Sequence, residues 1–158
     1  MPLSISDPVL TIKNRIKTDW VKANVSDILP AFHTGFLNPA GQQHQVTFPS
    51  SSEATPTDSG FDAIRSDGST SRRMGTVACM IFGRRAATKS QHSLNPKKFV
   101  FQARAEVERI IHAAMVAETD FEYMSVIASA GIPPDTDHEP PFFGWTVQIQ
   151  YVWRKTLT

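Results

Sequence analysis

The sequence predicts a two-layer α+β domain, in which two main helices pack on one face of a mixed or antiparallel sheet of about four strands. Two patterns carry this prediction. Residues 143–153 alternate large apolar with small or polar side chains, the period of a strand with one buried face. Residues 96–115 repeat apolar side chains every three or four positions, the period of an amphipathic helix. With 158 residues, 41% of them hydrophobic, the chain is expected to form a single domain over residues 1–158.

The first helix is predicted to begin at Pro8. Ser6 or Asp7 can cap it, and proline suits a first helical turn. We expect it to end near residues 23–24, because Pro30 soon blocks continuation. Its apolar face comprises Val9, Ile12, Ile16 and Trp20.

Residues 45–48 are a candidate short strand, which Pro49 is expected to end. From residue 50 to residue 71 the composition changes to Ser, Thr, Asp, Gly and Pro. Such a segment buries too little apolar surface to offset its ordering entropy. We therefore expect a flexible or arm-like insertion at about 50–71, with Phe61 and Ile64 as anchors on a neighbouring subunit.

Three further segments follow a strand pattern. Residues 74–83 are apolar at both parities, which is typical of a central strand covered on both faces, with a partner strand on each side. Residues 121–129 are rich in aromatic and branched side chains and indicate another long strand, with a short helix as the alternative. A proline-rich turn then leads to residues 143–153, so these last two segments are expected to pair antiparallel.

The second helix is expected to begin at Pro96, after a capping residue, and to continue to about Met115. Arg104 and Glu108 stand four positions apart on its outer side, where they can pair. Its buried stripe comprises Val100, Ala103, Val107, Ile110, Ile111 and Ala114.

Charge is divided along the chain although the net charge is only +1. Residues 72–109 hold nine basic and two acidic side chains, whereas residues 110–142 hold six acidic ones and no Lys or Arg. One hypothesis is that the basic surface of one copy docks on the acidic surface of the next; the alternative is two ordinary solvated surfaces. The candidate subunit or tube interface comprises Phe61, Ile64, Arg72, Arg73, Arg84, Arg85, Lys97, Lys98, Glu118, Asp120, Glu122, Gln148 and Gln150.

Catalytic and cofactor chemistry is not indicated. The glycines are never grouped as a phosphate-binding loop requires, so no nucleotide cofactor is expected. His138 lies between Asp137 and Glu139, but neighbours in an extended turn point in different directions, so no metal site is expected. His112 is interpreted as a boundary residue of the second helix, and Cys79 as a buried apolar side chain. We expect a protein that is not an enzyme.

Nucleic-acid binding is a weaker alternative. Aromatic side chains on a sheet can stack on bases, but the four in the last strand share one parity and are interpreted as core. The net charge also argues against a dedicated nucleic-acid binder. Residues 84–98 remain the candidate for contact with a phosphate backbone without sequence preference.

Neither a membrane nor an oxidising compartment is indicated. No apolar stretch approaches the roughly 20 residues that a spanning helix needs, and the N-terminus lacks a secretory signal pattern. A single cysteine forms no disulfide within the chain. The expectation is a soluble protein made in the cytoplasm.

The order of segments carries a family resemblance. An amphipathic helix at 8–22 precedes a central strand at 76–82, a helix with an acidic and apolar register at 105–111, and a closing aromatic strand at 145–151. In this order and spacing the chain resembles the tail terminator proteins, also called minor tail or tail-completion proteins, of lambda-like tailed bacteriophages. The insertion at 50–71 departs from simpler members, and a neck or head-closure component is the alternative within the virion.

The resemblance implies a structural subunit of the virion tail or neck, without catalytic activity. It implies a hexameric ring of identical subunits that caps the tail tube and receives the head connector. The implied partners are thus further copies of the chain, the tail tube protein and a connector or neck protein, with possible contact to DNA in the lumen and none to a membrane.

Overall fold

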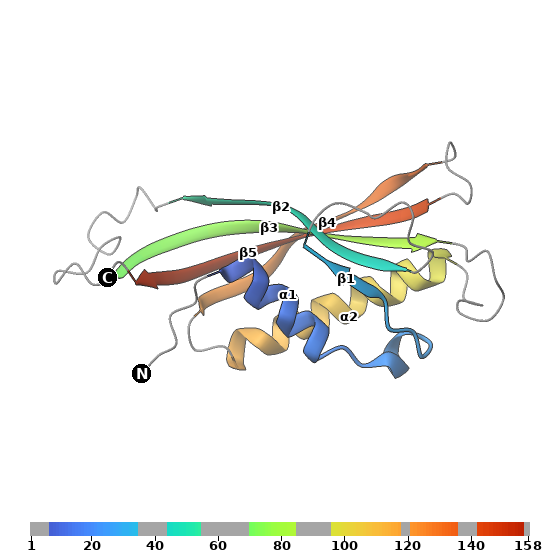
Figure 1. Cartoon of the computed structure of the whole chain (residues 1–158), viewed down its shortest axis with the longest axis horizontal. Helices are drawn as coiled ribbons and strands as arrows, with labels where there is room; N and C mark the ends of the chain where they lie inside the picture. The colour runs from blue at the N-terminus through green and yellow to red at the C-terminus, as the bar shows by residue number, and fades with distance from the viewer. Residues whose placement is uncertain are drawn as a thin grey trace.

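The computed structural model describes residues 7–34, 44–54, 70–84, 96–117, 121–135 and 142–156. The helices are α1 (Pro8–Thr18), the short 3-10 helix η1 (Lys22–Val25) and α2 (Pro96–Ala117). The strands are β1 (Ala31–His33), β2 (Gln45–Ala54), β3 (Thr70–Arg84), β4 (Phe121–Asp135) and β5 (Phe142–Thr156). They form one sheet in the order β1-β2-β3-β5-β4, and both α-helices lie on the same side of it (Figure 1).

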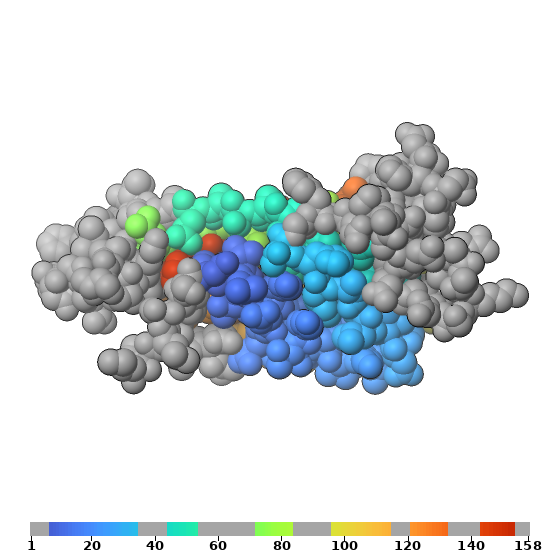
Figure 2. Space-filling model, viewed as in Figure 1, coloured from blue at the N-terminus to red at the C-terminus, as the bar shows by residue number. Residues whose placement is uncertain are grey.

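The predicted α+β class is therefore confirmed, with five strands in place of about four. The additional strand is the three-residue β1, which pairs parallel with β2 and makes the sheet mixed. All other pairs in the described sheet are antiparallel. In the space-filling view, α1 and the segment after it form a continuous surface beside β2 (Figure 2).

Helix α1 begins as predicted but ends earlier. The Asp7 side chain accepts a hydrogen bond from the amide of Leu10 and caps the helix. The end predicted near residues 23–24 is wrong, because α1 stops at Thr18. The Val21 amide bonds to the carboxylate of Glu106 on α2, and the chain turns away. Trp20 is nevertheless buried, and its indole N–H donates to the carbonyl of Ile28 at 3.0 Å.

Strand β2 passes through the proline that was expected to end it. A register shift between Thr47 and Ser50 places Pro49 in a bulge, where no ladder hydrogen bond from its nitrogen is needed. Residues 50–54 and 70–71, predicted as part of the insertion, are therefore strand residues. The remainder of that segment, with Phe61 and Ile64, lies outside the described residues.

The centre of the sheet confirms the predicted pairings. Strand β3 lies between β2 and β5, and β4 pairs antiparallel with β5, so the helical alternative for residues 121–129 is wrong. The predicted coverage of β3 on both faces is seen only in part, since Ala78 on the face away from the helices is also buried. Val77, Cys79 and Ile81 are buried under the helices, whereas Met74, on the opposite parity, is 37% exposed. Both described α-helices pack on a single face, so the second face lacks that cover.

Helix α2 supplies the largest part of the helical layer that covers one face of the sheet. Its predicted apolar stripe from Val100 to Ala114 is buried throughout, and Arg104 pairs with Glu108 at 3.8 Å as expected. Gly83 of β3 sets how closely the helix can begin. A Cβ on Gly83 would lie 2.3 Å from the carbonyl oxygen of Pro96, so only glycine lets the first turn of α2 rest against the strand.

Candidate functional site

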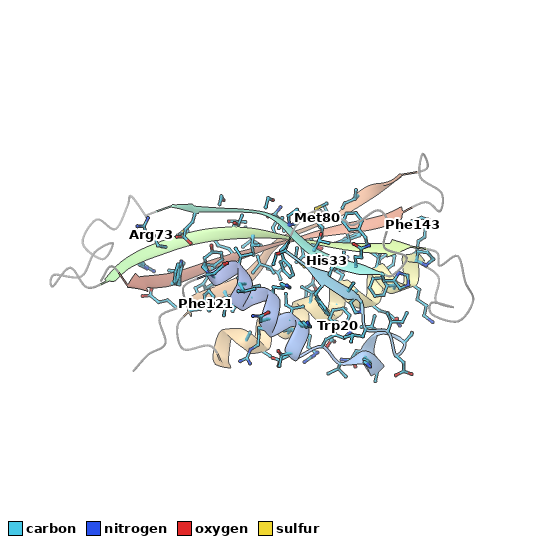
Figure 3. The ribbon with its side chains drawn as sticks, in the orientation of Figure 1. Trp20, His33, Arg73, Met80, Phe121 and Phe143 are labelled. Atoms are coloured by element: carbon cyan, nitrogen blue, oxygen red, sulfur yellow. The ribbon has the colours of Figure 1, made fainter. Side chains whose placement is uncertain are left out.

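An aromatic and cationic cluster lies where α2 begins and β5 begins. The Lys97 Nζ atom lies 5.5 Å from the ring centre of Phe143, and the Arg104 guanidinium carbon lies 4.7 Å from the ring centre of Trp145. The ring of Phe101 stands 6.0 Å from that of Trp145 at 43°. We call these five residues the aromatic–cation surface. Figure 3 shows Phe143 at this end of the sheet, far from Phe121 near the other end.

Local sequence spacing explains how the cluster forms. Positions 97, 101 and 104 share one stripe of α2, and positions 143 and 145 share one face of β5. Gly83 pairs with Phe143 and permits the close start of α2, which sets Lys97 beside that ring. On β4, Ser129 accepts a hydrogen bond from the Trp145 indole N–H and holds this ring in place.

The aromatic–cation surface is open to solvent to an unusual degree. Phe101 is 59% exposed, more than any other large apolar side chain in the described residues. Lys97 and Lys98 are exposed, and Phe143 and Trp145 are only half-buried. A cation over an exposed ring contributes only about 0.5–1 kcal/mol. The surface therefore presents both positive charge and ring area to a partner.

The second candidate surface is the sheet face that carries no described α-helix. Met74, Tyr123 and Ile127 are 37, 40 and 50% exposed there, the last at a bulge in β4. Gln148 and Gln150 occupy the same face of β5, as their predicted polar parity requires, and the Gln150 amide donates to the Met74 sulfur at 3.5 Å. We call these five residues the open face. It combines apolar area with amide groups that can bond to a neighbour.

One residue of the basic block and one of the acidic block meet within the chain. The Arg72 Nε atom lies 2.9 Å from a carboxylate oxygen of Glu122. This one pair lies within a single molecule, and docking between the charged blocks of neighbouring copies stays a prediction.

The other predicted site residues lie in or near the aromatic–cation surface, on β3, or outside the described part of the chain. Lys97 belongs to the aromatic–cation surface, Lys98 lies beside it, and Arg73 pairs with Trp153 in the β3–β5 register. Arg84 ends β3, and its side chain is outside the described set. The predicted interface residues that fall wholly outside the described residues are Phe61, Ile64, Arg85, Glu118 and Asp120.

A buried carboxylate that the sequence analysis missed joins the helices. Glu106 of α2 accepts hydrogen bonds from the Val21 amide at 2.9 Å and from the Asn24 side chain at 2.8 Å. The Arg109 guanidinium also donates to it, and in addition to the backbone carbonyl of Asp19 at 2.9 Å. A carboxylate on the apolar stripe of α2 was the available signal, because such a group is buried only when it is paired.

The hydrogen bonds determine the charge state of Glu106. Burial alone would raise its pKa, but the donors from Arg109, the Val21 amide and Asn24 outweigh burial, and the pKa lies below its ordinary value. The carboxylate therefore stays ionised at neutral pH. It anchors the connection between α1 and η1 to α2, which is a structural role.

The far end of β5 forms a second, buried aromatic group. The Tyr151 hydroxyl donates to Glu53 of β2 at 3.0 Å, and the Trp153 indole N–H donates to the same oxygen at 2.9 Å. The Tyr151 ring passes over β3 at Gly75, where a Cβ would lie 2.2 Å from it. Burial, reinforced by the Glu53 carboxylate, raises the pKa of Tyr151. We call Gly75, Tyr151 and Trp153 the buried aromatic end; Glu53, which accepts from both side chains, is an exposed residue at its rim.

A groove of about 430 Å³ lies between α2 and β4. His112 and Glu108 line it together with Ser125. Cys79 is buried, and burial raises its pKa, which opposes formation of a reactive thiolate. Within the described ranges, no group of three or more His, Cys, Asp or Glu side chains is placed to hold a metal ion.

Comparison with known proteins adds no relative. No protein-family model matches the chain, and no curated protein sequence matches it. Among the helices of the described residues, none has the length and apolar character needed to cross a membrane.

Proposed function

We propose that this chain is a structural virion protein of the tail-terminator kind. In this proposal, identical copies form a ring, with six subunits as the family resemblance implies. The ring caps the tail tube and provides the surface on which the head–neck connector docks. The protein is made in the host cytoplasm and acts in the virion, without a catalytic step.

The open face carries this proposal. It lies on strands of up to 15 residues, and it exposes Met74, Tyr123 and Ile127 next to two glutamines. Apolar area beside hydrogen-bonding groups is typical of a surface that contacts another protein. The order of helix, strands, helix and two long strands also agrees with the order on which the resemblance rests.

Two alternatives remain as proposals. A neck or head-closure component would use the same kind of subunit contact at a different level of the virion. A small module that binds single-stranded nucleic acid is favoured by one observation, the cations that lie against the aromatic rings at the start of α2.

Multi-angle light scattering of the full chain, alone and with a tail tube subunit from the same source, tests the ring proposal. We expect a ring-sized species under at least one condition. A strict monomer under both conditions would contradict it. Genes for portal, tube and tape-measure proteins next to the coding sequence would support it independently.

A charged pair of substitutions tests whether the open face makes the contact. Tyr123→Asp combined with Ile127→Asp should abolish assembly, because it buries two carboxylates in the proposed interface. Leu10→Asp, a matched substitution at a 41% exposed position of α1, should leave assembly intact. Equal assembly of both variants would show that a different surface makes the ring.

A further inference from the structure

We propose that the aromatic–cation surface binds single-stranded nucleic acid, with phosphates held by Lys97 and Lys98 and a base stacked on the ring of Phe101. The sequence predicts phosphate contact in residues 84–98 and places the aromatic side chains of the last strand in the core. In the fold, the first turns of α2 lie against the start of β5, so cations of the helix contact aromatic rings of the strand. This inference does not depend on ring formation.

Charge supports an anionic partner. Lys97 and Lys98 are exposed in the first turn of α2, whose N-terminal backbone amides add partial positive charge. Arg104 lies two turns further along. Its recorded carboxylate partner, Glu108, stands 3.8 Å away, a loose pair at 33 and 40% side-chain exposure. Such a pair competes weakly with a phosphate group.

Ring geometry supports unpaired bases. Phe101 is 59% exposed, so much of its ring is open to a partner, and it leans against Trp145 at 6.0 Å. Trp145 is held by Ser129 and covered by Arg104, which gives the exposed ring a rigid support. Unpaired bases can stack on an exposed aromatic side chain, whereas the bases of a duplex are already stacked on one another.

Fluorescence anisotropy of the full chain with a labelled polythymidine of about 20 nucleotides tests the inference. We expect binding at about 20 mM salt that weakens steeply as salt rises. Affinity falls as salt rises, and Lys97→Ala with Lys98→Ala should make this dependence shallower. The magnitude of the slope of log affinity against log salt should decrease by about 1.4, roughly 0.7 for each lost phosphate contact. Phe101→Ala should weaken binding about tenfold with little change in slope.

The matched control removes the same charge elsewhere. Lys17→Ala with Lys22→Ala alters two exposed lysines on the N-terminal helices and should change binding little. A duplex of the same length should bind more weakly and should not respond to Phe101→Ala. Far-ultraviolet circular dichroism of each variant verifies the fold.

Three results would overturn the inference. The first is no binding by the wild-type chain at low salt. The second is an equal loss in the control pair, which would show diffuse charge attraction. The third is loss of self-assembly in Phe101→Ala without any nucleic-acid binding by the wild type, which would assign the surface to a second copy of the chain.

Discussion

The two ends of β5 carry the same alternation of aromatic side chains but have opposite surroundings. At the buried aromatic end, Tyr151 and Trp153 are 1 and 2% exposed and share the Glu53 carboxylate. At the other end, Phe143 and Trp145 are half-buried and contact cations of α2. One end of the strand is fully buried core, whereas the other packs against the edge of the core and is partly exposed.

The difference shows what an alternating pattern can and cannot specify. Alternation determines which side chains share a face of the strand. It does not determine how much of that face the helices cover, because coverage depends on where they begin and end. Buried ring area stabilises the fold, whereas half-exposed ring area beside positive charge is available to a partner.

A large loss of stability is expected from removing the buried carboxylate that ties the segment after α1 to α2. Glu106→Ala should lower the free energy of unfolding by about 3 kcal/mol, because the donors of Val21, Asn24 and Arg109 lose their shared acceptor. Urea unfolding measures the change. Glu108→Ala, a partly exposed carboxylate two positions away, is the control and should cost less than about 1 kcal/mol. Equal losses would contradict a special role for Glu106.

Acid titration gives a second measure of the same anchor. The pKa of Glu106 is lowered in the folded state, so its contribution is present above the pKa of the unfolded state, about 4.3, and is lost as pH falls through the folded value. The wild type should lose stability more steeply than Glu106→Ala below about pH 4.3. Parallel acid profiles would argue against an ionised, hydrogen-bonded Glu106.

Alanine substitutions at two glycines of β3, one beside each end of β5, should distinguish the two ends with intermediate losses of stability. Gly75→Ala crowds the Tyr151 ring and should lower stability by about 1–3 kcal/mol without changing nucleic-acid binding. Gly83→Ala crowds the start of α2 and should lower stability similarly, but it should also weaken binding at the aromatic–cation surface. Thermal unfolding and anisotropy of both variants provide the comparison. The same binding phenotype in both would remove the distinction.

Tyr151 provides the smallest expected effect. Tyr151→Phe removes one hydrogen bond to a carboxylate that still accepts from Trp153, and should cost about 1.5 kcal/mol at neutral pH. The pKa of Tyr151 is raised in the folded state, so its contribution is present below about pH 10, where the free side chain titrates, and is lost as pH rises further. The wild type should therefore approach the stability of the variant in alkali. A constant difference across pH would contradict this.

Sequence patterns could predict the α+β class, the parity of β5 and the buried stripe of α2, because each follows from a local period. They could not predict the bulge at Pro49, which depends on pairing with β3. Nor could they predict the Glu106 anchor, whose donors Val21 and Asn24 are more than 80 residues away in sequence. The predicted core side of β5 includes Phe143 and Trp145, which do pack against the core. Their partial exposure could not be predicted, since it depends on where α2 meets the sheet.

Separate alanine substitutions of the two tryptophans on β5 test most directly whether the two ends of the strand differ in burial and in binding. Trp153→Ala should lower the free energy of unfolding by about 3–5 kcal/mol, as for a buried large side chain. Trp145→Ala should cost less than half as much, but it should weaken binding of the polythymidine about tenfold. Equal stability losses, together with unchanged nucleic-acid binding by the folded Trp145→Ala variant, would show that both ends of β5 serve as core alone.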